Sequence, residues 1–448
     1  MAEEENLNNM KYDKLFKLAK EKGISDIEIA VSTSSDLSFS LFHGEVDSYT
    51  SSSSSSYLIR GIYNNKLGSV SSDVYDNSLV EYFIDQIINN AKFVENDDPV
   101  FIFEGSPKYK KVNTFNKELE NISIDEKMAK LHQLETRIKE LDNRIVEVEA
   151  VEYAESTFVE SIYNSKGLKL SSKNNYFFYY GGALANVDGQ AKSGGEIYLG
   201  NDFSKFDVEE LAKAIVESTV SQLGGEPCES GKYKAVLSQD VVKAFVSAYI
   251  SSASSEDVQK NSSLFLNKLN QKVASRKVTI EDKPLAKTPF ARWFDAEGVA
   301  TYNKPVIKNG QLMTYFYSLT TAAKEGVQST GNAVAAGSKS YTGPWYLEMK
   351  PGKKSLEELF QEVGNGVYIT EVMGLHAGLN PRSGNFSLQS TGFLIKDGKK
   401  DRPLDIITVS GNLVQLFNDI IEVGNDSKLF IGSSIPSAIV KKIVVSGK

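Results

Sequence analysis

Cysteine and histidine are both scarce in this chain. Cys228 is the only cysteine among 448 residues, so no disulfide can form within the chain and nothing in its cysteine content indicates secretion. The three histidines, His43, His132 and His376, lie far apart in the sequence, and none has a second histidine or a cysteine at helical spacing. Because protein zinc sites are built mainly from these two residue types, a histidine-rich zinc site is hard to assemble here.

Long apolar segments and runs of positive charge are also missing. No segment approaches the ~20 apolar residues that a membrane-spanning helix needs, and the acidic residues 1–6 do not resemble a signal peptide. The chain has 50 Lys and Arg against 58 Asp and Glu, a net charge of −8. This acidic balance argues against broad attraction to nucleic acid or anionic membranes. We therefore expect a cytoplasmic protein that binds neither nucleic acid nor membrane.

The sequence does contain the ordinary material of a globular protein, with 41% hydrophobic residues. In the first half, strand-like alternation is mixed with amphipathic segments that predict helices at residues 7–20, 77–93, 123–141 and 207–223. The segment Gly224-Gly225-Glu226-Pro227 then interrupts regular structure. The sequence predicts an α+β fold in two domains, a mixed α/β N-terminal half over residues 1–223 and a β-dominated C-terminal half over residues 224–448.

Several local signals define expected turns and strands. The six serines at residues 51–56 could form a flexible linker, but β-rich sequence on both sides favours a strand continuing to residue 63. Asn309-Gly310 and Asp397-Gly398 each separate two alternating segments, which predicts two tight β-hairpins. Further helices are expected at residues 238–252, 264–269, 355–363 and 412–419.

The segment 371–399 is the strongest candidate binding region. It runs from an expected strand through a loop rich in Gly, Asn, Pro and Ser into the second hairpin, and loops of this kind often bind ligands. A plain turn is the alternative interpretation. Seven residues of this loop are candidate contacts: Gly374, His376, Asn380, Ser383, Gly384, Asn385 and Phe386.

The sequence evidence for other catalytic or binding sites is weaker. A serine hydrolase triad using His376 as its base rests only on the abundance of serine. Asp295 and Glu297 could bind a cation or orient a partner strand, but a solvated acidic turn is the commoner arrangement. The segment following Ser238 predicts a helix whose later turns are rich in serine and therefore polar.

Six segments spread over nearly the whole chain form a recognisable set: residues 42–49, 59–62, 260–263, 273–275, 294–298 and 380–387. Taken together and in order, they resemble the TldD/PmbA family, specifically its PmbA (TldE) branch. The resemblance implies paired subunits that form a metallopeptidase acting on unfolded peptides. Members of the TldD branch carry a His-Glu-x-x-x-His helix and a late cysteine as metal ligands.

The resemblance also implies that this chain lacks the metal site. Aligned on residues 260–263, the two histidines of the motif fall at Val246 and Ser251 and its glutamate falls at Ser247. The late cysteine falls near residues 424–427, where none is present. Valine cannot bind a metal, and a neutral serine is both a poor ligand and a poor base. We expect no catalytic residue, no metal and no cofactor in this chain.

The expected role is that of a non-catalytic subunit. It would pair with a TldD-like subunit that carries the zinc ion, and the loop at residues 374–386 would contact an unfolded peptide or the partner, with neighbouring strands available for strand addition. The alternative is a homodimeric binding or scaffold protein without a peptidase role. The mild acidity and the β-rich second half fit both.

Overall fold

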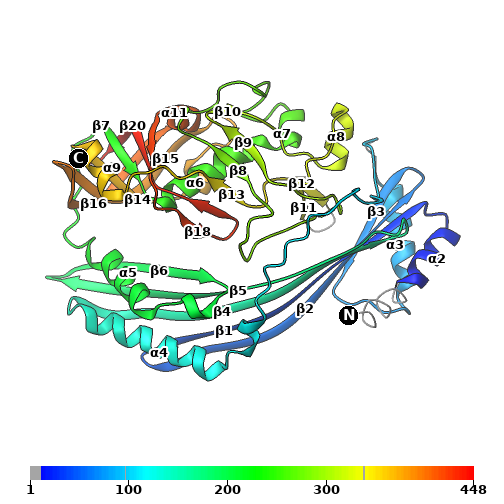
Figure 1. Ribbon diagram of the computed structural model, residues 1–448, viewed down its shortest axis with the longest axis horizontal. Coiled ribbons are helices and arrows are strands. Elements are labelled where there is room, and N and C mark those ends of the chain that lie inside the picture. The colour runs from blue at the N-terminus through cyan, green and yellow to red at the C-terminus, as the bar shows by residue number, and fades with distance from the viewer. Residues whose placement is uncertain (1–11, 96, 337–338) are drawn as a thin grey trace.

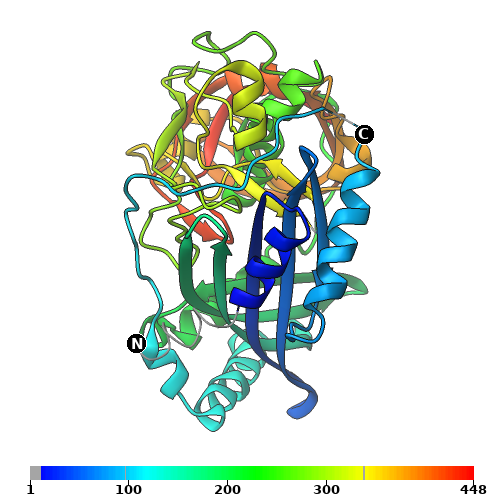
Figure 2. The same cartoon turned by 90° about the vertical axis from the view of Figure 1, so that its right-hand side faces the viewer.

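The computed structural model describes residues 12–95, 97–336 and 339–448. It has two layers, a long curved antiparallel sheet built from the N-terminal half and a β-rich body built from the C-terminal half (Figure 1). The turned view shows the C-terminal elements stacked over the sheet (Figure 2). The helices and sheets are mixed, as the predicted α+β fold requires.

The N-terminal sheet has the strand order β3-β2-β1-β4-β5-β6. Four of its strands are unusually long, and β1, for example, runs without interruption over residues 26–42. The serine segment 51–56 lies inside β2, paired with residues 32–37 of β1, which confirms the strand interpretation. The strands are β1 (Asp26–Phe42), β2 (Glu45–Tyr63), β3 (Lys66–Ser72), β4 (Ile145–Asn164), β5 (Lys169–Val187) and β6 (Gln190–Gly200).

Two pairs of helices cover the ends of this sheet. The helices α2 (Asp13–Glu21) and α3 (Val80–Lys92) bury Leu15 and Phe83 against β1 and β2. The helices α4 (Ile124–Leu141) and α5 (Val208–Val220) bury their apolar faces against β1, β4 and β5 in a second, separate core. The Ser123 hydroxyl accepts a hydrogen bond from the Glu126 amide and caps α4, as its sequence predicts. The middle of the sheet lies between these two cores.

The C-terminal half is organised around a closed ring of strands. Antiparallel and parallel pairings give the order β16-β15-β14-β7-β20, and β16 also pairs with β20, which closes the ring. The helix α6 (Gln239–Ile250) packs into the large core within this half, whereas α9 (Leu356–Val363) packs on the other face of the strands. The ring strands are β7 (Gly231–Leu237), β14 (Gly366–Met373), β15 (Asn385–Lys396), β16 (Lys399–Asn412) and β20 (Ala438–Ser446).

Shorter elements complete this half. A second sheet has the order β10-β9-β8-β13-β19-β18, and β11 and β12 form a separate hairpin near the N-terminal sheet (Figure 1). The short strands are β8 (Ile280–Asp282), β9 (Lys304–Lys308), β10 (Gln311–Leu312), β11 (Ala333–Ala336), β12 (Lys339–Thr342), β13 (Leu347–Met349), β17 (Ile420–Val423), β18 (Lys428–Phe430) and β19 (Ser433–Ile435). The short helices are α7 (Ser255–Gln259), α8 (Leu319–Glu325), α10 (Leu375–Gly378) and α11 (Leu413–Asn418), with 3-10 turns at Lys117–Asn121, Phe203–Lys205 and Ser251–Ala253.

The structure confirms both hairpins and corrects one helix. Asn309-Gly310 and Asp397-Gly398 turn with positive φ at all four residues, as this type of tight hairpin requires. The helix predicted at 264–269 is wrong. That segment forms consecutive turns, and the left-handed backbone at Asn267 (φ 58°) and Asn270 (φ 61°) is incompatible with a continuing helix.

Candidate functional site

The candidate loop connects two neighbouring ring strands, β14 and β15. After β14 the chain turns at Gly374, whose φ of 76° favours glycine. It then forms the single helical turn α10, which contains His376. His376 is exposed, and among the described residues its ring makes no hydrogen bond or ion pair. The structure therefore gives His376 no serine or carboxylate partner, and the triad has no geometric support.

Asn380 holds the rest of the loop in shape. Its side-chain oxygen accepts hydrogen bonds from the amides of Arg382 and Ser383, both at 3.0 Å. Its backbone amide donates to the carbonyl of Asn385 at 2.9 Å, and its carbonyl accepts from the Gly384 amide at 2.8 Å. The Asn380 amide group is thus used internally to close a tight turn. Ser383 and Asn385 stay exposed at the surface of that turn.

Phe386 fixes the loop to the body of the C-terminal half. Its side chain is 4% exposed, and its ring centroid lies 4.9 Å from that of Phe245 on α6. A shallow cavity of about 410 Å³ lies beside it, lined by residues 377–381 and 385–387. The structure therefore places five of the seven candidates at the surface of one loop, whereas Gly384 is buried in its turn and Phe386 lies in the core beneath it.

The neighbouring strands are less available than expected for strand addition. β14 is hydrogen-bonded to β7 and β15, and β15 is hydrogen-bonded to β14 and β16. β15 pairs with β16 along its length, but β7 pairs with β14 only from Val367 to Ile369. Among the described residues, the part of β14 beyond Ile369 has no strand partner on its β7 side, so strand addition has only this short edge available. The loop beside it also presents polar groups to solvent.

The helix α6 carries the positions that correspond to the metal motif. Val246 is 1% exposed and belongs to the core, whereas Ser247 and Ser251 are exposed. The Ser251 hydroxyl donates to the Ala248 carbonyl at 2.8 Å. A buried valine and two neutral hydroxyls do not fit a zinc ion. Among the described residues no group of three or more His, Cys, Asp or Glu side chains is placed to hold a metal.

The segment 424–427 also lies away from these positions. The Asp426 carboxylate accepts a hydrogen bond of 2.8 Å from the Gln239 side chain, in the first turn of α6. Gln239 precedes Val246 by about 10 Å along the helix axis at ~1.5 Å per residue. The candidate loop therefore lies beside the middle of α6, whereas the segment 424–427 lies at the N-terminal end of this helix.

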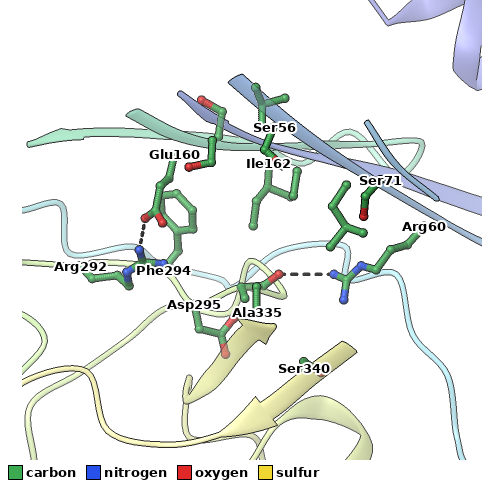
Figure 3. A pocket seen from close by; sticks show the side chains of 16 residues that line it. Ser56, Arg60, Ser71, Glu160, Ile162, Arg292, Phe294, Asp295, Ala335 and Ser340 are labelled. Carbon is green, nitrogen blue, oxygen red and sulfur yellow. Dashed lines mark hydrogen bonds and ion pairs between the residues drawn. The ribbon is translucent and has the colours of Figure 1, made fainter. Parts of the chain in front are cut away.

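A second polar region lies between the two layers, and of its residues the sequence analysis singled out only Asp295 and Glu297. Figure 3 shows a cavity of about 200 Å³ whose walls come from the N-terminal sheet and from residues 292–296 and β11–β12. Arg60 of β2 enters it from the sheet side, forms an ion pair with Glu28 of β1, and donates to the Ala296 carbonyl at 3.3 Å. Arg292 forms an ion pair with Glu160 of β4.

Asp295 and Glu297 belong to this buried region, so the solvated turn expected for them is wrong. Asp295 is fully buried and accepts hydrogen bonds from the amides of Glu297 and Val299, both at 2.9 Å, and of Ala333 at 3.0 Å. Burial and the nearby Glu297 carboxylate raise the pKa of Asp295 to about 7. Burial likewise raises the pKa of Glu297. The flanking aromatic pair Trp293-Phe294 was the available signal for burial.

Comparisons with known proteins identify the family. Three sequence models of PmbA/TldA metallopeptidases match: domain 1 over residues 27–91, the central domain over residues 117–223 and the C-terminal domain over residues 230–447. The chain belongs to the PmbA/TldD family. Among its relatives, the metalloprotease PmbA homolog of Buchnera aphidicola is 28% identical over 398 residues, which cover 86% of this chain and 85% of the relative.

Two solved structures share the whole PmbA/TldD architecture. A Thermotoga maritima protein described as a candidate modulator of a DNA gyrase is 32% identical, with a TM-score of 0.91 over 98% of this chain and 100% of that one. TldE from Thermococcus kodakarensis is 23% identical, with a TM-score of 0.90 over 98% and 100% of the two chains, and it shows the fold alone. Among the described residues no helix is long and apolar enough to cross a membrane.

Proposed function

We propose that this chain is the non-catalytic, PmbA/TldE-like subunit of a TldD/TldE-type metallopeptidase that acts on unfolded peptides in the cytoplasm. The observation that carries this proposal is the composition of α6. The family fold is kept over nearly the whole chain, yet the motif positions on that helix hold Val246, Ser247 and Ser251. A zinc ion would then belong to a TldD-like partner alone.

In this role the loop between β14 and β15 contacts the peptide or the partner subunit. The exposed side chains of His376, Ser383 and Asn385 lie on a turn that Asn380 shapes from within. Phe386 ties that turn to Phe245, one residue before the first motif position on α6. The contact is made mainly by loop side chains, because among the described residues β14 leaves only a short edge beyond Ile369 without a strand partner.

Co-expression with a TldD-like chain from the same source tests the proposal. We expect co-purification, peptidase activity only in the mixture, and loss of peptide turnover or assembly when His376→Ala is combined with Asn385→Ala. His132→Ala is the matched control, because His132 is also exposed but lies on α4 of the N-terminal half. Peptidase activity of this chain alone with stoichiometric metal contradicts the proposal.

A homodimeric binding or scaffold protein is the second candidate function. It is favoured if the chain does not co-purify with a TldD-like protein and if the loop variants leave every peptidase activity unchanged. The same co-expression therefore separates the two proposals.

A further inference from the structure

The N-terminal sheet carries apolar side chains on a face that α4 and α5 do not cover. These helices pack on the opposite face, where Tyr153, Phe177 and Tyr179 lie in a shared core. Because successive side chains of a strand point to opposite faces, the residues of β5 that alternate with this core lie on the other face. Their cross-strand partners on β6 are apolar as well. We call these four side chains the apolar strip: Phe178, Tyr180, Ile197 and Leu199.

The apolar strip is exposed rather than packed. Ile197 is 42% exposed and Tyr180 is 36% exposed, while Phe178 and Leu199 are half-buried. Among the described residues, the strip belongs to none of the hydrophobic cores of either half. Apolar side chains that gather at a surface in this way commonly mark a place where another molecule binds.

Two glycines lie beneath the ring of Tyr180. Gly182 of β5 and Gly195 of β6 are cross-strand partners on the same face. A Cβ atom at Gly182 would lie 3.0 Å from the Tyr180 hydroxyl oxygen, and one at Gly195 would lie 2.8 Å from it. The absence of side chains at both positions therefore lets the ring lie along the sheet. Glycine inside a strand weakens the strand and often marks a place where a ligand or another backbone approaches closely.

Hydroxyl and acidic side chains continue this face across β4, β1 and β2. Two rows of cross-strand neighbours run from the apolar strip to β2, and both end in hydroxyl side chains. Glu152 lies directly beside Tyr180, and neither row contains a Lys or Arg, so this part of the face is acidic. The two rows are Ala154, Ser38 and Thr50 beside Phe178, and Glu152, Ser40 and Ser48 beside Tyr180.

The exposed face of α6 is turned toward the β6 edge of the sheet. Lys428 of β18 forms an ion pair of 3.0 Å with Glu196 of β6 and one of 3.1 Å with Asp240 of α6. Ser247 and Ser251 follow Asp240 by 7 and 11 residues, so they lie on the same side of the helix. In Figure 1, β6 is the edge of the sheet that faces α6 and β18. The motif positions and the apolar strip therefore lie at the same contact between the two halves.

We propose that the apolar strip binds aromatic and aliphatic side chains of an unfolded peptide, and that Glu152 binds a Lys or Arg side chain of the same peptide. Aromatic rings stack on the exposed ring of Tyr180. The serine and threonine hydroxyls both donate and accept hydrogen bonds, which suits the polar groups of an extended chain. A carboxylate without a basic neighbour in its row favours a cation. The inference rests on the proposed function for the ligand being a peptide, and it adds a binding surface in the N-terminal half with a preference for basic, aromatic sequences.

Fluorescence anisotropy of the purified full chain tests this surface, with a labelled peptide of three Lys-Phe-Ser-Gly repeats as the probe. Tyr180→Ser should raise the Kd at least about fivefold, because it removes the exposed ring, while far-UV circular dichroism stays like that of wild type. Tyr180→Phe keeps the ring and should bind like wild type. Val187→Ser is the matched control, because Val187 is an apolar residue of β5 with 38% exposure that lies on the opposite face, and the Kd should not change.

A second peptide, with Gln in place of every Lys, tests the charge preference. Glu152→Gln should raise the Kd of the Lys peptide at least about threefold and leave the Kd of the Gln peptide unchanged, because only the first peptide carries a cation for the carboxylate. Equal effects on the two peptides would overturn the role of Glu152.

Three results would overturn the binding surface: no saturable binding of the Lys peptide by wild type, an unchanged Kd for Tyr180→Ser, or an equal loss of affinity in Val187→Ser. These results differ from a failure of the subunit role. Peptide binding that Tyr180→Ser weakens, in a chain that does not co-purify with a TldD-like protein, contradicts the subunit role and supports the surface. Peptidase activity of the mixture together with a Kd that Tyr180→Ser leaves unchanged supports the subunit role and contradicts the surface.

Discussion

Two polar regions of this molecule use their residues in opposite ways. Between the layers, Arg60, Glu28, Asp295 and Glu297 are buried together and hydrogen-bonded to backbone and to one another. Beside α6, where the family motif places metal ligands, the corresponding positions hold a buried valine and two exposed serines. The difference indicates that buried ionisable groups occupy the contact between the two halves, where Arg60 and Arg292 bond across it, while the helix of the catalytic motif packs the core.

In the buried charged region, the substitution of Arg60 should lower the free energy of unfolding most. Arg60→Ala leaves the Glu28 carboxylate buried without its partner, which costs about 3–5 kcal/mol of unfolding free energy. Urea denaturation measures this loss of unfolding free energy. The double variant Arg60→Met with Glu28→Gln should recover part of the loss, because no unpaired charge remains. An Arg60→Ala protein as stable as wild type would show that the buried Glu28 carboxylate does not depend on its ion pair with Arg60.

Stability should also depend on pH through Asp295. Its pKa is raised from 3.8 to about 7 on folding, so the native state binds a proton more tightly than the unfolded chain. The free energy of unfolding should therefore fall as pH rises from about 4 to about 7, by about 1.4 kcal/mol for each pKa unit of difference. Glu297→Gln removes a neighbouring negative charge and should end the decline at a lower pH. A pH profile identical in wild type and variant would contradict the assignment.

At the motif positions of α6, histidine should destabilise the protein at Val246 but not at Ser251. Val246→His places a polar ring in the core and should cost about 1–3 kcal/mol. Ser251→His lies at the surface and should stay within about 0.5 kcal/mol of wild type. Thermal unfolding distinguishes them. Equal effects would mean that Val246 is not part of the core.

The loop should lose only a modest amount of stability. Asn380→Ala removes the acceptor for two backbone amides of an exposed turn, and about 1 kcal/mol is expected. Hydrogen exchange of the Arg382 and Ser383 amides should rise before global stability changes. Unchanged protection of these amides would show that Asn380 does not shape the loop.

The sequence predicted most elements through local signals and missed what depends on distant contacts. The Asn309-Gly310 and Asp397-Gly398 hairpins and the helices expected at residues 238–252 and 355–363 follow from neighbouring residues, and the structure confirms them. The burial of Asp295 involves Ala333, whose amide donates to it from far away in the sequence, so an acidic turn was a reasonable but wrong expectation.

The same limit applies to the candidate site. The sequence placed seven candidate residues in one loop, but it could not show that Phe386 is buried against Phe245 or which edges of β14 are paired. Both facts depend on contacts with segments far away in the sequence, α6 for Phe386 and β7 for β14.

The most direct test of the account is the zinc content and peptidase activity of the purified chain, alone and mixed with a TldD-like chain from the same source. The account predicts no stoichiometric zinc and no activity for this chain alone, and activity with one zinc per TldD-like subunit in the mixture. Stoichiometric zinc and peptide hydrolysis by this chain alone would contradict it.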